Sequence, residues 1–258
     1  MVSKMTSKIK VDTIEEKTSS NGVSIDGVKL KDNILTVQGT STTGGTIEIE
    51  NTDTSGANGD FIGKINFKGN DSSGGASGTR AAIEAKVVSN FGSTELHFKT
   101  AASGASATDA MVIDSAGHIT KPLQPAFLVT PSGVQSDVAS NDTIAFGTEV
   151  FDLNGDFASN SFTAPVTGKY QINHGVRIDN LDSSGTWIDV RIKSSNKDYD
   201  ALQSATLLDT DSGFFFFSHS ALIDMDASDT VFLQFLKSGG SNTGDVSTSS
   251  YFSGYLVC

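Results

Sequence analysis

The chain has 258 residues, enough for one large domain or two small ones, and 35 Ser, 26 Thr and 26 Gly make up about a third of it. These residues are poor helix formers and no apolar heptad is present, which excludes a coiled coil, while 21 aromatic residues argue against a disordered chain. The net charge of −12 opposes binding to nucleic acid and to anionic membranes.

The only cysteine is Cys258, the last residue, so the chain has no internal disulfide framework and no metal site built on thiolates. The first ten residues contain no apolar signal-peptide core, and no apolar run is long enough to cross a bilayer. We therefore expect a soluble protein made in a reducing compartment, with no membrane insertion.

Charge and aromatic content divide the chain into three predicted parts. Residues 1–40 carry a net charge of +1 and no aromatic residue, and residues 41–121 carry −3 and four aromatics. Residues 122–258 carry −10, seventeen aromatics and all four prolines. A core that depends on large side chains is therefore expected only in the third part.

The first part, residues 1–40, shows short stretches in which apolar and polar residues alternate, separated by turn dipeptides such as Asn21-Gly22. Such strands contain too little apolar mass to fold alone. We predict that they dock to another protein through Ile9, Val11 and Ile14.

The middle part, residues 41–121, repeats a design in which short strands alternate apolar with charged residues and Ser/Gly-rich stretches connect them. The predicted strands are 46–50, 60–68, 82–88, 94–99 and 111–114. Each strand has one apolar face that needs cover, and five short strands cover one another poorly. We therefore predict a β-shaft in which identical chains intertwine around a common axis.

The last part, residues 122–258, has the strongest strand patterns. Between residues 169 and 179, Tyr170, Ile172, Val176 and Ile178 share one face, and residues 187–193 alternate likewise. Eight to ten such strands without a helical pattern predict a β-sandwich of the jelly-roll type. The predicted fold class is thus all-β throughout.

Three blocks of the last part resemble the globular head of complement component one-q, a family that shares a ten-stranded jelly roll with tumour necrosis factor. The blocks are Phe151–Tyr170, with its Phe-Thr-Ala-Pro sequence, Ile223–Leu233, and Tyr251–Val257, with the sequence Tyr-Phe-Ser-Gly-Tyr-Leu-Val. The resemblance covers roughly residues 125–258. It implies a homotrimer in which the apolar face of each protomer packs around a three-fold axis.

Residues 7–120 resemble fibre and appendage proteins of tailed bacteriophages. The similar blocks are Ser7–Ile14, Gly63–Asp71 and Ala110–Ile119, the last with a Met-x-Ile-Asp-Ser-x-Gly motif that often precedes a terminal head or chaperone domain in those proteins. The usual continuation Val-Gly-Ile-Gly is replaced here by Thr-Lys-Pro-Leu. The resemblance implies a virion surface appendage that is synthesised in the host cytoplasm.

No catalytic set is recognised, because the four histidines are far apart in sequence and none lies in a zinc or nucleophile motif. Asp152, Asn154 and Asp156 have the alternating oxygen ligands of a calcium loop, but no Glu follows at the required position. A turn between strands explains the same residues. We predict no enzyme activity, no cofactor and no metal, with calcium at this turn as the alternative.

The predicted trimer interface consists of His174 and the run Phe214, Phe215, Phe216 and Phe217. In a strand, two of the four phenylalanines enter the sandwich core and two point outward, where a trimer axis would cover them. His174 falls on the apolar face of its strand, which places it in the core or at the trimer axis. A titrating switch at the axis is the alternative for this histidine.

Trp187 and Arg191 share the face of their strand opposite the apolar residues, and we predict that they contact a receptor. An outward Trp beside polar residues is suited to stacking on a sugar, although covering a neighbouring strand is the more common role.

The function expected from the sequence is that of a homotrimeric phage fibre. Residues 1–40 would dock to other virion proteins, 41–121 would form the shaft, and 122–258 would form a head that binds a host-surface glycan or protein. The alternative is a capsid or tail decoration fibre that stabilises the particle without binding a receptor. A polysaccharide-degrading tailspike would need paired carboxylates in a groove.

Overall fold

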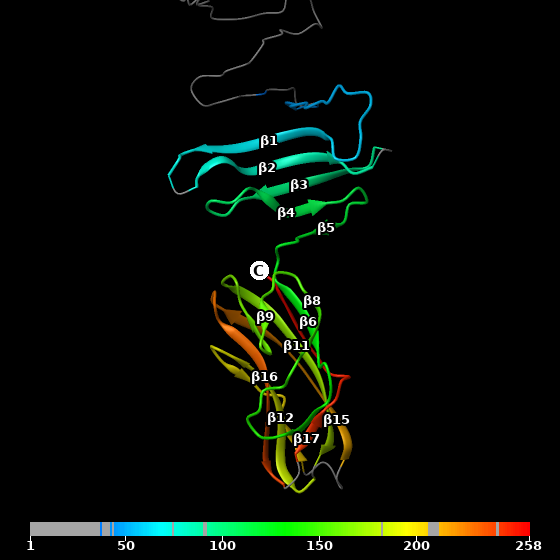
Figure 1. The fold of residues 1–258 in the computed structure, drawn as a ribbon, viewed down its shortest axis with the longest axis vertical. Helices are drawn as coiled ribbons and strands as arrows, with labels where there is room; N and C mark the ends of the chain where they lie inside the picture. The colour runs from blue at the N-terminus through cyan, green and yellow to red at the C-terminus, as the bar shows by residue number, and fades with distance from the viewer. Residues whose placement is uncertain are drawn as a thin grey trace, which may run out of the picture. The chain divides into compact units, whose positions relative to one another are not determined.

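The computed structural model describes residues 37, 42, 44–73, 75–89, 92–181, 183–205, 212–240 and 243–258 (Figure 1). Within these ranges the chain forms eighteen β-strands and no α-helix, and so contains no helix with the length and hydrophobicity that a bilayer crossing requires. The contacts within the chain divide it into two compact units, Met1–Ile49 and Glu50–Cys258. The predicted docking residues Ile9, Val11 and Ile14 lie outside the described residues.

The first five strands form one antiparallel sheet in chain order. They are β1 (Phe61–Asn70), β2 (Ser77–Val87), β3 (Thr94–Thr100), β4 (Thr108–Ile113) and β5 (Ile119–Thr120). Figure 1 shows β1 to β4 as a single layer. The Asp-Ser-x-Gly part of the Met-x-Ile-Asp-Ser-x-Gly motif forms the turn between β4 and β5, in which Asp114 Oδ1 accepts hydrogen bonds from the backbone N–H groups of Ala116 (2.9 Å) and His118 (2.8 Å). Gly117 supplies the positive φ (88°) that this turn needs.

The remaining strands form two sheets of a β-sandwich. One sheet has the order β13-β12-β16-β10-β9, with β14 also paired to β12, and the other has the order β7-β17-β11-β18-β6-β8, with β15 paired to β11. Their bounds are β6 (Ala126–Thr130), β7 (Gln135–Val138), β8 (Thr148–Asp152), β9 (Phe157–Ala158), β10 (Ser161–Thr163), β11 (Gly168–Leu181), β12 (Gly185–Ser194), β13 (Asp198–Tyr199), β14 (Gln203–Ser204), β15 (Ser212–Met225), β16 (Thr230–Gly239), β17 (Gly244–Val246) and β18 (Tyr251–Leu256). The all-β jelly roll expected from the sequence is confirmed.

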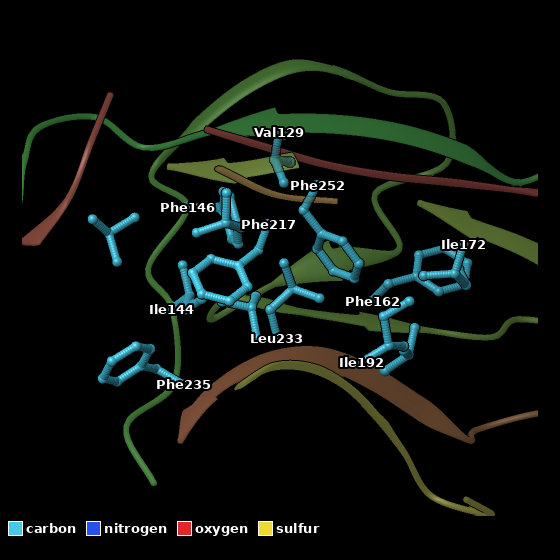
Figure 2. Close-up of a cluster of buried hydrophobic side chains, with 14 of the residues drawn as sticks. Val129, Ile144, Phe146, Phe162, Ile172, Ile192, Phe217, Leu233, Phe235 and Phe252 are labelled. Atoms are coloured by element: carbon cyan, nitrogen blue, oxygen red, sulfur yellow. The ribbon is translucent and has the colours of Figure 1, made fainter. Parts of the chain in front are cut away.

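The core lies between the two sheets, and Figure 2 shows its side chains converging from both. Tyr170, Ile172, Val176 and Ile178 point into it from β11, as the alternation predicts, and each is fully buried. An aromatic cluster fills one region of the core. The stacked rings of Phe127 and Phe162 (4.7 Å between centroids) form its centre.

The first and last strands of the sandwich are neighbours, because β6 pairs with β18. The segment before β6 also binds β18: Leu256 N–H donates to Pro125 O (3.0 Å), and Gln124 Nε2 donates to Leu256 O (2.6 Å). The chain therefore enters and leaves the jelly roll at one end. The turns that follow Leu181 and Gly239 lie at the opposite end, because β11 runs from Gly168 beside Leu256 to Leu181.

Candidate functional site

The outward side of the sheet that contains β11 is the best candidate for an interaction surface. We call it the β11 face and define it by the outward residues of three adjacent strands. They are Phe214, Phe216, Ser218, Ser220 and Leu222 on β15, Gln171, Asn173, Gly175 and Arg177 on β11, and Tyr251, Ser253 and Tyr255 on β18. Because opposite residues of antiparallel strands share a face, the register alone assembles this surface.

The four consecutive phenylalanines of β15 alternate between the β11 face and the core. Phe214 and Phe216 are 60% and 47% exposed, whereas Phe217 is 2% exposed. Phe215 packs against the ring of Phe217, with 4.9 Å between centroids. The set predicted for the trimer interface is therefore corrected: a ring in the sandwich core cannot also reach a neighbouring protomer, so Phe215 and Phe217 leave that set.

Gly175 lies at the centre of an aromatic cluster on this face. Its cross-strand neighbour on β18 is Tyr251. A Cβ atom added at position 175 would collide with two rings, because it would lie 2.6 Å from Cζ of Phe216 and similarly close to the Tyr251 ring. The two rings thus cover the glycine from both flanking strands. The missing side chain makes room for these two rings.

Arg177 and Asp179 border this cluster on β11. The guanidinium carbon of Arg177 lies 4.5 Å from the centroid of the Phe214 ring, and its Nε donates to Asp179 Oδ1 at 2.6 Å. The guanidinium thus stacks on the Phe214 ring and pairs with the Asp179 carboxylate at the same time. It holds the Phe214 ring against the sheet while leaving its outer side exposed.

A polar network occupies the middle of the β11 face. Gln171 Nε2 donates to Ser220 Oγ at 2.7 Å, and Ser220 Oγ donates to Asn173 Oδ1 at 2.7 Å. Leu222 and Tyr255, which are 57% and 49% exposed, flank Gln171 on β15 and β18. The face therefore presents apolar groups at both ends of a polar centre.

The strand β15 also leaves one edge open, since among the described residues it pairs only with β11. This edge is fourteen residues long and carries Phe214, Phe216 and Leu222 on its outward side. A long apolar edge of this kind promotes pairing or aggregation unless a partner covers it.

His174 lies in the sandwich core. It is 1% exposed, stands opposite His219 on β15, and neither of its ring nitrogens has a hydrogen-bond partner. Burial, and next the nearby His219, lowers the pKa of His174 to about 4. Its prediction as an interface residue is corrected, because its side chain points away from the β11 face.

Trp187 and Arg191 both lie on the outward side of β12, as the alternation predicts. The guanidinium of Arg191 is held by three carboxylates, through Nε to Asp189 (3.3 Å) and Asp200 (2.7 Å) and through Nη1 to Asp198 (3.0 Å). Asp189 is fully buried, and burial raises its pKa. Arg191 is therefore the counter-charge of a buried carboxylate. Trp187 is half-buried, so part of its ring remains exposed.

The predicted calcium ligands form a capped turn. The Asp152 carboxylate accepts hydrogen bonds from the backbone N–H groups of Asp156 (3.1 Å) and Phe157 (2.8 Å), and Asn154 Nδ2 donates to Leu123 O (3.2 Å). No group of three His, Cys, Asp or Glu side chains suited to a metal ion occurs in the described part of the chain. Both alternatives for this turn, no metal and a bound calcium ion, stay predictions.

The sequence patterns did not indicate Gly175, Tyr251, Leu222 or Tyr255 as surface residues. The alternation around Phe252 in the last strand carries a signal for Tyr251, which is 37% exposed. The role of Gly175 depends on which strands flank it, and a single strand pattern does not contain that information.

The fold defines a class, the jelly-roll domains of the C1q type. Domains of this class form trimers, and they are typically binding modules without enzyme activity. The model of the C1q domain family matches residues 126–257, about half of the chain. The chain therefore belongs to the C1q domain family.

Two solved structures illustrate what the chain is similar to. The globular domain of zebrafish complement 1qA protein is 19% identical, with a TM-score of 0.41, and the match covers 52% of this chain and 98% of that one. Murine APRIL, in a crystal structure at pH 8.0, is 8% identical, with a TM-score of 0.40 and coverage of 52% and 99%.

Proposed function

We propose that this chain is a structural fibre protein of a bacteriophage particle. In this proposal three chains form a homotrimer, residues 1–40 dock to the particle through Ile9, Val11 and Ile14, and the C1q head binds the host surface. The resemblance of residues 7–120 to phage fibre proteins supports the virion role. The membership of the head in a class of trimeric binding modules supports the mode of action.

The observation that carries the proposal is the β11 face. Phe214 and Phe216, on the edge strand β15, and Tyr251, on β18, expose aromatic rings around Gly175. Exposed aromatic clusters of this kind are costly in water and mark sites of protein association. In the proposed trimer, this face packs on neighbouring protomers around the three-fold axis.

The proposed receptor contacts lie at the end of the jelly roll opposite to the point where the chain enters. Trp187 belongs to this end, since Gly185 and Gly239 pair two residues away at the end of β12. We drop Arg191 as a free contact because its three carboxylate partners occupy it. Three weak sites on one trimer would give avidity well above the affinity of one site.

The test measures adsorption. The purified full chain is added to host cells before infection, and we expect it to bind the cells and to reduce phage adsorption, whereas a Trp187→Ala variant with unchanged mass and melting temperature blocks less well. If neither protein binds cells, although images of the particle show the chain on its surface, a decoration fibre is favoured. A molar mass of 27.0 kDa by light scattering, that of a single chain, would contradict the trimer.

A further inference from the structure

We propose that one face of the β1–β5 sheet is an interface between three copies of this chain, so that the sheets of a trimer pack around the same axis as the heads. The inference rests on the proposed trimer and names the partner of a surface outside the head. The strand register sorts the side chains of this sheet onto two faces of different chemistry.

One face, which we call the apolar face, consists of three cross-strand rows without a charged side chain. The rows are Ile65–Ile83–Phe98–Met111, Gly63–Ala85–Leu96–Ile113–Ile119 and Phe67–Ala81–Thr100. The first row forms a ridge of large side chains across four strands. Beside it lie Gly63 and Ala85, which project no large side chain, so a ridge from a second sheet can pack against them.

The opposite face carries the charges and neutralises them within the sheet. Lys99 Nζ lies 2.8 Å from Asp109 and 3.6 Å from Glu84. The ring nitrogens of His97 lie 3.0 Å from Asp109 and 3.1 Å from Glu95. This charged face is suited to solvent, and it needs no partner to be stable.

In the part of the chain that the structure describes, the apolar face, in contrast, is only partly covered. Ile65, Phe67 and Ile119 are 46%, 54% and 60% exposed, and the other large side chains of the rows are only half-buried. Burying one such side chain fully contributes about 1.5–3 kcal/mol. A single-layer sheet that leaves such side chains partly in water lacks much of the burial that would stabilise it.

The covalent connection to the head identifies identical chains as the occupant. Only residues 121–125 separate the last strand of the sheet from the first strand of the head, a distance of at most about 18 Å in an extended chain. A trimer of heads therefore holds three of these sheets within reach of one another, at an effective concentration of about millimolar or higher. The absence of charge on the apolar face also disfavours a partner recognised by charge.

The first test compares two adjacent residues of β1 in the full-length chain. Ile65 lies on the apolar face and Asn66 on the charged face, and both are exposed in the single chain. We expect Ile65→Lys to lower the melting temperature by several degrees and to expose residues 60–120 to trypsin, because the new charge is buried between sheets. Asn66→Lys should leave the melting temperature and the sensitivity to trypsin unchanged. Equal behaviour of the two variants would overturn the proposal.

The second test measures proximity between chains. In a Cys258→Ser background, we expect Ile65→Cys to give covalent dimers on SDS gels after treatment with a short bis-maleimide, and Asn66→Cys to give none. If Ile65→Cys is protected from maleimide but forms no dimers, a segment of the same chain covers the face, and the proposal is contradicted.

The outcomes separate this inference from the proposed function. If light scattering gives three times the mass of one chain, while Ile65→Cys reacts freely and does not cross-link, the trimer stands and the interface on the apolar face is refuted. If the mass is that of one chain, both are refuted.

Discussion

The ring of Tyr251 lies directly on the backbone of Gly175, its partner in the adjacent strand, and the Phe216 ring reaches the same glycine from the other side. The three residues come from three different strands, and the smallest of them determines the position of the two larger ones. The position of an exposed aromatic surface thus depends on the absence of a side chain.

A Gly175→Val substitution tests this relationship. The added atoms would collide with the rings of Tyr251 and Phe216 and displace them from the sheet. We expect the trimer to weaken at least tenfold in dissociation constant, measured by light scattering on dilution, since the displaced rings no longer present the same contact surface. Gly133→Ala is the control, because its Cβ meets no atom within 4 Å; a similar loss in both variants would contradict the prediction.

Phe216 and Phe217 are neighbours that serve different purposes. Phe217→Ala removes a ring that is 2% exposed and should lower the free energy of unfolding by about 3–5 kcal/mol. Phe216→Ala removes an outward ring, so it should weaken the trimer and leave the unfolding of the dissociated chain within about 0.5 kcal/mol. Urea denaturation at low concentration and sedimentation at high concentration measure the two effects. Similar denaturation midpoints would show that the assignment of faces is incorrect.

His174 makes the head sensitive to acid. Its pKa is about 4 in the folded head, against an ordinary value of 6.5, so the unfolded chain binds more protons between these pH values. Stability therefore rises with pH through this window, and acidification from pH 6.5 to 4 should cost about 3 kcal/mol. Denaturation midpoints measured across the window test this.

A His174→Phe variant is the matched change, because it keeps an aromatic ring and removes the titrating nitrogens. We expect its pH dependence between 4 and 6.5 to be weaker than that of the natural chain. An unchanged slope would assign the acid sensitivity to other groups.

Removing Arg191 leaves the buried Asp189 without its counter-charge. We expect Arg191→Ala to lower the free energy of unfolding by about 3–5 kcal/mol. The double variant Asp189→Leu/Arg191→Met should recover most of this loss, because neither charge is then buried. Thermal unfolding measures both, and full stability of the single variant together with loss of cell binding would restore Arg191 as a receptor contact.

Asp156 distinguishes the turn from a calcium site. Burial, and next the charge of Asp152, raises the pKa of Asp156, and its Oδ2 has no hydrogen-bond partner. A raised pKa means that the ionised group destabilises the fold above that pKa. Asp156→Asn should thus raise the melting temperature at pH 7 by a few degrees. Millimolar calcium should shift neither protein; a shift in the natural chain alone would establish the calcium alternative.

Alternation along single strands predicted much of the head. It sorted the residues of β11 correctly onto two faces, separated the phenylalanines of β15 into two inward and two outward, and placed Trp187 outward. These successes share a cause, since the period of two is a property of one strand and needs no knowledge of its neighbours.

The errors arose where the role of a residue depends on contacts from other strands. Arg191 was predicted as a free contact because Asp198 and Asp200 reach it only after the chain has turned back along β12. His174 was assigned to the interface because an apolar face can be a core or an oligomer contact, and only the second sheet distinguishes them. The N-terminal docking strands and the intertwined shaft remain predictions.

The pairing of β6 with β18 has a consequence for how this head can be exchanged. A domain whose two ends lie side by side can be replaced in one piece by any other domain with a similar base, without rerouting the chain on either side of it. For the same reason its ends could be joined and new ones opened elsewhere. Recombination at the short 121–125 segment would thus exchange the whole head while leaving the preceding sheet untouched.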